Sequence, residues 1–150
     1  MVSIVRLREL LENIIWQENE LYNLYKLGET FASSEKPSFM SHFSWLASEE
    51  LRHRMTVEGF LEEGMLEGTP IIDYLDALGL EPYFKDERVE PKTLEDLILD
   101  ALIREKHSYE LYSKLSKILE GSLSEIFLMM ANEELKHAYR LKIMYEMLGE

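Results

Sequence analysis

Apolar residues recur at helical spacing through most of the chain. Steps of one to three helical turns from Glu18 reach residues that are almost all apolar or aromatic. The same holds around Glu50, Glu105 and Glu134. Four apolar stripes of this kind predict four amphipathic helices, each with one glutamate in the middle of its inner face.

Capping residues and breaks set the expected ends of these helices. The first helix is predicted to begin after a Ser3 cap and to end before a loop at 33–37. Capping boxes at 93–96 and 122–125 are expected to open the third and fourth helices, with Gly121 between them. The predicted ranges are about 3–31, 38–63, 94–120 and 122–148.

The stretch 64–93 differs from the rest, because it contains three prolines and several glycines. Within it we expect one short apolar helix at 71–78. The stretch is long enough to cross the length of a bundle and to place the third helix parallel to the second. The predicted fold is therefore all-α: a four-helix bundle of two antiparallel hairpins joined by a long crossover, in one domain over residues 1–150.

Composition narrows the chemistry. The 150 residues contain no cysteine, which excludes disulfides, zinc knuckles and iron–sulfur clusters, so that any metal is held by oxygen and nitrogen. The net charge of −13 argues against a nucleic-acid partner. No apolar run approaches the roughly 18 residues of a membrane span, and the N-terminus lacks a signal segment. We therefore expect a cytoplasmic protein without a membrane partner.

Two seven-residue segments are nearly the same and lie 84 residues apart, from position 50 to position 134. Each ends in Glu-x-x-His, and because three residues make about one helical turn, the Glu and the His share a face. The segments are Ala47-Ser48-Glu49-Glu50-Leu51-Arg52-His53 and Ala131-Asn132-Glu133-Glu134-Leu135-Lys136-His137.

A second repeat reads Glu-x-x-x-Tyr-x-x-Tyr, from Glu18 to Tyr25 and from Glu105 to Tyr112. Four-helix di-iron carboxylate sites take one Glu from each of two helices and a Glu-x-x-His from each of the others. Without cations, four carboxylates facing one core would repel each other and would be costly to desolvate. The predicted metal ligands are Glu18, Glu50, His53, Glu105, Glu134 and His137.

Neighbouring polar residues are not expected to bind the metals. Glu49 and Glu133 precede the ligands by one residue, about 100° around the helix, so we expect them to be solvated or paired with Arg52 or Lys136. His42 returns to the face of His53, but it lies roughly 16 Å away along the helix.

As a set, these positions resemble the rubrerythrin branch of the ferritin-like di-iron carboxylate superfamily, over all four helices. The resemblance implies bridging roles for Glu50 and Glu134, terminal roles for Glu18 and Glu105, and one histidine per metal. It also implies that Tyr25 and Tyr112 hydrogen-bond the ligand carboxylates.

The chain departs from that family in two respects. Rubrerythrins add a rubredoxin domain with four cysteines, and these 150 residues include none. They also carry a further glutamate three residues beyond the third-helix ligand, where this chain has Ser108. The ligand pattern of cage-forming ferritins matches less well.

The resemblance implies a di-iron oxidoreductase that reacts with dioxygen or hydrogen peroxide and is re-reduced by an external electron donor, such as a rubredoxin-like protein. The expected cofactor is two iron ions, although manganese or zinc would also suit the ligands. A homodimer is a further expectation from the family. Two alternatives stay open: a non-catalytic metal-binding or iron-storage protein, including a ferroxidase that feeds storage, and a metal-free four-helix interaction module.

Overall fold

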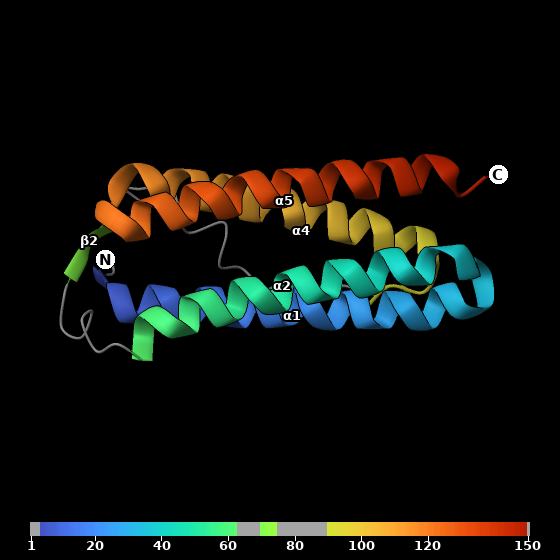
Figure 1. Cartoon of the computed structure of the whole chain (residues 1–150), viewed down its shortest axis with the longest axis horizontal. Helices are drawn as coiled ribbons and strands as arrows, with labels where there is room; N and C mark the ends of the chain where they lie inside the picture. Colours follow the sequence, from blue (N-terminus) through green and yellow to red (C-terminus); the bar gives the residue numbers. More distant parts are fainter. Residues whose placement is uncertain (1–3, 63–69, 75–89, 150) are drawn as a thin grey trace.

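The computed structural model describes residues 4–62, 70–74 and 90–149, with side chains in 7–62 and 90–149. Four long helices dominate it (Figure 1). In chain order the elements are β1 (Ile4–Arg6), α1 (Leu7–Glu35), the 3₁₀ turn η1 (Pro37–Phe39), α2 (Met40–Glu62), β2 (Pro70–Tyr74), α4 (Leu94–Ile118) and α5 (Gly121–Met147).

The helices pack as two hairpins, α1 with α2 and α4 with α5. In Figure 1 each hairpin is antiparallel, and α2 and α4 run in the same direction along the bundle. The predicted all-α bundle of two antiparallel hairpins is therefore confirmed. Most of the connection between α2 and α4 lies outside the described residues.

A short two-stranded antiparallel ribbon accompanies the bundle, and the sequence did not predict it. Ile4 pairs with Tyr74 and Arg6 with Pro70, with an irregular register between the two pairs. The expected helix at 71–78 is therefore wrong over 71–74, and its last residues lie outside the described part of the chain. The β-branched Ile71 and Ile72 suit a strand once a partner strand is present.

The same pairing shifts the start of the first helix. It begins at Leu7 because residues 4–6 form β1, so the predicted start after Ser3 is wrong; Ser3 itself lies outside the described residues. At its other end, α1 continues past the predicted limit to Glu35. The hydroxyls of Ser33 and Ser34 donate to carbonyl oxygens one turn earlier, which lets polar residues complete the last helical turn.

The second hairpin shows one predicted cap and one error. The Thr93 hydroxyl accepts a hydrogen bond of 3.1 Å from the Asp96 backbone N–H at the start of α4, as the capping box predicts. Helix α5, however, starts at Gly121, so Ser122 lies inside the helix and does not cap it. Gly121 has φ +67°, a left-handed conformation that favours glycine at the tight turn between α4 and α5.

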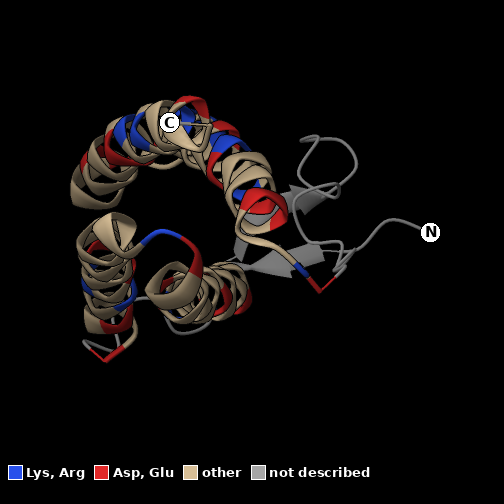
Figure 2. Cartoon of the chain, turned by 90° about the vertical axis from the view of Figure 1, so that its right-hand side faces the viewer, with Lys and Arg blue, Asp and Glu red and all other residues tan. Residues whose placement is uncertain are grey.

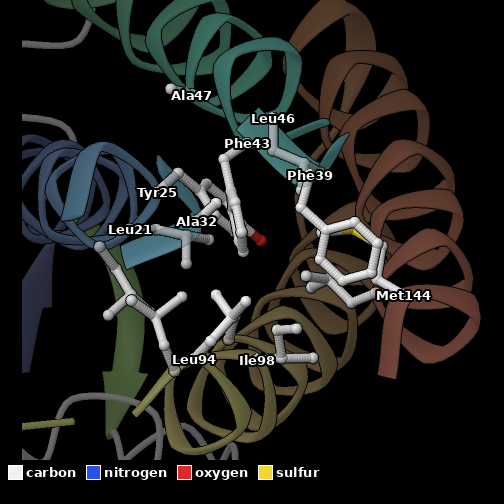
Figure 3. Packing of buried hydrophobic residues seen from close by; sticks show 14 residues of the cluster. Leu21, Tyr25, Ala32, Phe39, Phe43, Leu46, Ala47, Leu94, Ile98 and Met144 are labelled. Carbon is white, nitrogen blue, oxygen red and sulfur yellow. The ribbon is translucent and has the colours of Figure 1, made fainter. Parts of the chain in front are cut away.

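Two apolar clusters fill the bundle, one toward each end. One contains Tyr25, Phe43 and Ile98 and appears in Figure 3; the other contains Leu11, Tyr112 and Phe127. The predicted ligands fall between these clusters along all four helices. The centre of the bundle is thus a polar layer enclosed by apolar packing.

Lysine, arginine, aspartate and glutamate residues are distributed along all four helices, as the colouring of Figure 2 shows. Among the described helices, none has an apolar stretch of the length that a membrane crossing requires.

Candidate metal centre

The structure brings all six predicted ligands together in the middle of the bundle. Each is at most 1% exposed, although all six are polar or charged. They form two overlapping groups whose potential ligand atoms lie within 4.8 Å of one another, and Glu50 and Glu134 belong to both. The groups are Glu18, Glu50, His53 and Glu134, and Glu50, Glu105, Glu134 and His137.

In the first group, the imidazole of His53 faces the carboxylates with its Nδ1 atom. This atom is 2.9 Å from Glu134 Oε1 and 3.6 Å from Glu50 Oε2. Glu18 Oε1 lies 3.8 Å away. One nitrogen and three carboxylates therefore converge on one small volume.

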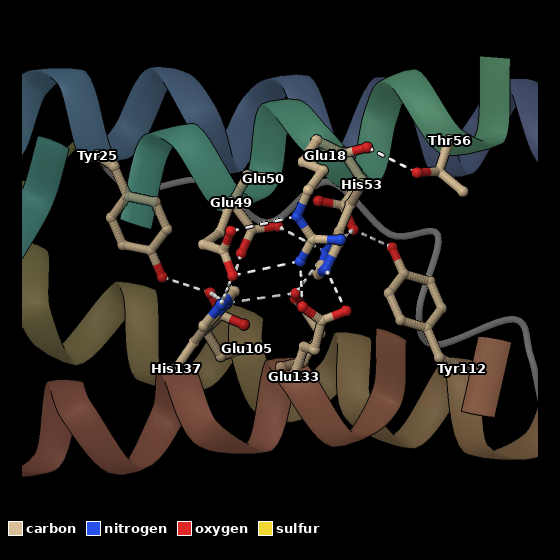
Figure 4. Close-up of polar contacts among 12 residues, drawn as sticks. Glu18, Tyr25, Glu49, Glu50, His53, Thr56, Glu105, Tyr112, Glu133 and His137 are labelled. Carbon is tan, nitrogen blue, oxygen red and sulfur yellow. Dashed lines mark hydrogen bonds and ion pairs between the residues drawn. The ribbon is translucent and has the colours of Figure 1, made fainter. Parts of the chain in front are cut away.

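The second group repeats this arrangement around His137, as Figure 4 shows. Its Nδ1 is 2.9 Å from Glu50 Oε1, 3.4 Å from Glu134 Oε1 and 3.5 Å from Glu105 Oε1. The rings of His53 and His137 are nearly parallel, with centroids 5.8 Å apart. The two groups thus sit side by side, with the shared carboxylates between them.

Many buried polar atoms of the site have no hydrogen-bond partner. They include both oxygens of Glu134, both ring nitrogens of His53 and one oxygen each of Glu18, Glu50 and Glu105. His53 Nδ1 and Glu134 Oε1 are 2.9 Å apart, yet their geometry does not form a hydrogen bond. Buried polar groups are nearly always satisfied, so atoms that converge without bonding each other indicate a ligand between them.

Burial and mutual repulsion disturb the carboxylates. Desolvation, followed by repulsion from neighbouring carboxylates, raises the pKa of Glu50 well above its ordinary value. The same causes raise the pKa of Glu134 to about 8. Desolvation also acts on Glu105, but hydrogen bonding to His137 outweighs it and lowers that pKa. Without cations, the carboxylates are therefore not all ionised at neutral pH.

The pKa values of the two histidines are also raised. Burial alone would lower these pKa values, but short contacts with the surrounding carboxylates and attraction to their charge outweigh it. The pKa of His53 rises to about 11 and that of His137 to about 10. In the metal-free site, protons thus neutralise part of the negative charge.

Two tyrosines support the terminal carboxylates from opposite ends of the site. The hydroxyl of Tyr25 donates to Glu105 Oε1, and the hydroxyl of Tyr112 donates to Glu18 Oε1. These are the contacts that the family resemblance implies. Burial raises the pKa of both tyrosines well above the ordinary value, so both hydroxyls keep the proton that they donate.

The outer edge of the site holds contacts that the sequence indicated only in part. Glu49 and Glu133 are paired with Arg52, as expected. The sequence did not indicate that they also face the outer nitrogens of the histidines: Glu133 Oε1 is 3.5 Å from His53 Nε2 and Glu49 Oε1 is 3.8 Å from His137 Nε2. The sequence could have indicated these contacts, because Glu49 and Glu133 occupy the same position in the two repeated segments.

The sequence did not indicate the cluster that Trp45, Arg140 and His42 form beside His137. Trp45 is 40% exposed and makes an edge contact with the ring of His137, with centroids 5.4 Å apart. The guanidinium of Arg140 lies 4.0 Å from the centroid of the Trp45 ring, and its Nη1 is 3.2 Å from Nδ1 of the part-buried His42. Trp45 thus packs against the ring of His137.

The donor set fits a pair of divalent cations. Each group supplies one imidazole nitrogen and three carboxylates, a mixture suited to iron(II), manganese or zinc. Two divalent ions would balance the charge of the four carboxylates and would satisfy the unpaired oxygen atoms. The buried position Ser108, one turn after Glu105, adds no carboxylate.

Comparison with known proteins supports the resemblance to rubrerythrins over the second hairpin. The family model described as Rubrerythrin matches residues 96–150, which cover nearly all of α4 and the whole of α5. The matched part contains Glu105, Tyr112, Glu134 and His137. No curated protein sequence matches the chain.

Proposed function

We propose that this rubrerythrin-like, ferritin-like chain is a di-iron oxidoreductase that uses hydrogen peroxide or dioxygen as its oxidant. The observation that carries the proposal is the pair of overlapping, fully buried ligand groups that share Glu50 and Glu134. Glu50 and Glu134, as carboxylates common to both groups, would hold two metals close together, where both could act on one small oxidant.

The protein's part in the chemistry is to hold and isolate the metals. Glu18 and His53 would complete one ion's ligands, and Glu105 and His137 the other's. When bound, two iron(II) ions would supply two electrons in total, which with two protons are enough to reduce hydrogen peroxide to two waters or dioxygen to hydrogen peroxide. The tyrosine hydroxyls keep the terminal carboxylates in place, and the apolar clusters on both sides exclude bulk water.

Turnover requires a source of electrons. These 150 residues contain no cysteine, so they cannot ligate an iron centre through thiolates. We therefore propose an external donor, such as a rubredoxin-like protein, that returns two electrons to the site after each oxidation.

The test is to load the protein anaerobically with iron(II), measure its metal content, and follow ferric absorbance after adding peroxide or oxygen. We expect two irons per chain and rapid oxidation. Glu50→Ala and Glu134→Ala should abolish two-metal occupancy, because each removes a carboxylate common to both groups. Glu146→Ala is the matched control on α5, since that side chain is 62% exposed.

The other outcomes separate the alternatives. Slow oxidation with ferric iron retained by the protein would contradict an oxidoreductase and favour iron storage. A protein that binds no stoichiometric metal would contradict the proposal altogether and leave an interaction module. A Glu146→Ala variant as defective as Glu134→Ala would show that the loss does not report on the site.

A further inference from the structure

The outer nitrogens of both histidines are buried, and neither has a hydrogen-bond partner. Because Nδ1 of each ring faces the ligand carboxylates, Nε2 points toward the outer edge of the site. A histidine that binds a metal through one nitrogen almost always donates the other N–H to a carboxylate, a carbonyl or water. The groups nearest to the two Nε2 atoms are therefore candidates to accept these N–H hydrogen bonds.

In both cases a carboxylate of the other Glu-x-x-His segment faces Nε2. Glu133 Oε1 lies 3.5 Å from Nε2 of His53, and it is itself buried without a hydrogen-bond partner. Glu49 Oε1 lies 3.8 Å from Nε2 of His137. Both distances are slightly longer than a hydrogen bond, so a small rotation of either side chain closes them.

One guanidinium holds both carboxylates. Arg52 Nε is 3.2 Å from Glu49 Oε2, and Arg52 Nη2 is 3.3 Å from Glu49 Oε1 and also donates to Glu133 Oε2. The contact joins α2 to α5 across the outer edge of the site, and Figure 4 labels the two carboxylates that it links, Glu49 and Glu133. A guanidinium has a planar set of donors that suits carboxylates, whereas an ammonium acts as a point charge.

We propose that Arg52, Glu49 and Glu133 form an outer clamp that fixes the tautomer and orientation of His53 and His137, with Nε2–H donated outward and Nδ1 directed at the metals. A carboxylate held by a guanidinium only accepts hydrogen bonds, so the facing nitrogen must carry the hydrogen. Arg52, Glu49 and Glu133 are positioning residues, since they act through the histidines.

The repeat supplies a matched control. The residue equivalent to Arg52 in the second segment is Lys136, which is exposed on α5. Among the residues that the structure describes, Arg52 is the cation seen to contact both acids. Arg52→Gln and Lys136→Gln therefore remove the same charge from the same region, but only the first opens the clamp.

The test uses zinc, which reports binding and ring geometry without redox chemistry. Zinc affinity is measured by competition with a chelator, and the ring nitrogens are followed by ¹⁵N NMR of the zinc-loaded protein. For Arg52→Gln and Glu133→Gln we expect affinity about 10- to 100-fold weaker and faster solvent exchange of the histidine Nε2–H. Lys136→Gln should match the unaltered protein, and Arg52→Lys should recover only part of the affinity.

Unchanged affinity and unchanged Nε2–H exchange in Arg52→Gln would overturn the clamp. Equal losses in Lys136→Gln would also overturn it, because the effect would then be one of charge alone. If Arg52→Gln fails to fold cooperatively, Glu133→Gln, which keeps the shape of its side chain, decides the question.

The proposal rests on the metal site of the proposed function but not on its reaction. Zinc binding that depends on the clamp, in a protein that does not oxidise iron, would contradict the oxidoreductase and leave the clamp standing. Rapid iron oxidation, together with no effect of Arg52→Gln on zinc binding, would contradict the clamp and leave the oxidoreductase standing.

Discussion

At the scale of single residues, the hydroxyl of Tyr112 illustrates how the site depends on groups that do not bind metal. It donates to Glu18 from the opposite hairpin, and Tyr25 donates to Glu105 in the same way. Both residues of each pair are buried, so bulk water cannot take the place of the tyrosine hydroxyl as the hydrogen-bond donor to the carboxylate.

Tyr112→Phe should therefore lower the free energy of unfolding of the metal-free protein by about 1–3 kcal/mol, the cost of leaving a buried acceptor unpaired. Chemical denaturation measures this difference. Tyr139→Phe is the control, since Tyr139 is 65% exposed, and it should change little. Equal stability of the two variants would contradict the role of the buried hydrogen bond.

Protons on the ligands lead to a second residue-scale prediction. With pKa values of about 11 for His53, about 10 for His137 and about 8 for Glu134, the metal-free site holds protons at pH 7. Metal ligands must lose these protons, so metal binding should release them, and affinity should fall as the pH is lowered.

Titration calorimetry with zinc in two buffers of different ionisation enthalpy measures this release. We expect more than one proton released per chain at pH 7, and weaker binding at pH 6 than at pH 8. Binding heats that do not depend on the buffer would show that the ligands are already deprotonated.

At the scale of elements, Gly28 shows how closely α1 packs on α2. A Cβ placed on Gly28 would lie 2.6 Å from Cδ1 of Phe43, a fully buried ring in one of the apolar clusters. Gly59, on α2, has no atom within 4 Å of the same position. Gly28 is thus needed for close packing of the two helices, whereas Gly59 affects only the backbone conformation of α2.

Gly28→Ala should destabilise the protein by about 1–3 kcal/mol through overpacking, even though alanine favours helices. Gly59→Ala should instead stabilise it by up to about 1 kcal/mol through helix propensity. Thermal unfolding of both variants checks the difference in sign. Stabilisation by both would mean that Phe43 moves aside at little cost.

The ends of the helices show where local sequence patterns were sufficient to predict the structure. The Thr93 cap was predicted correctly because it depends on residues next to each other in the chain. The start of α1 was not, because residues 4–6 pair with a strand nearly 70 positions away. Local patterns do not report such a partner.

At the scale of the whole molecule, the two hairpins repeat each other's contacts. Tyr25 with Glu105 corresponds to Tyr112 with Glu18. The contact of His53 with Glu134 likewise corresponds to that of His137 with Glu50. Every one of these contacts joins one hairpin to the other, so the site contributes to the packing of the two hairpins against each other, together with the apolar clusters.

Metal removal should therefore weaken the whole fold. A ligand that binds only the folded protein stabilises it by about 4 kcal/mol when its concentration is 1,000 times its dissociation constant. We expect a chelator to lower the melting temperature, and iron(II) or zinc to restore it. Glu134→Ala should show no such response, and an unaltered protein insensitive to chelation would contradict a metal centre.

The sequence by itself determined which residues face the interior of the bundle. Helical periodicity and the two repeats placed six ligand candidates and two tyrosines on inner faces, because the face that a residue occupies depends only on spacing along one helix. The tertiary structure alone decided which groups meet: each tyrosine with the terminal carboxylate of the other hairpin, each histidine with the acids of the other segment, and β1 with β2. Those contacts join residues far apart in the chain, and they exist only after the hairpins have packed together.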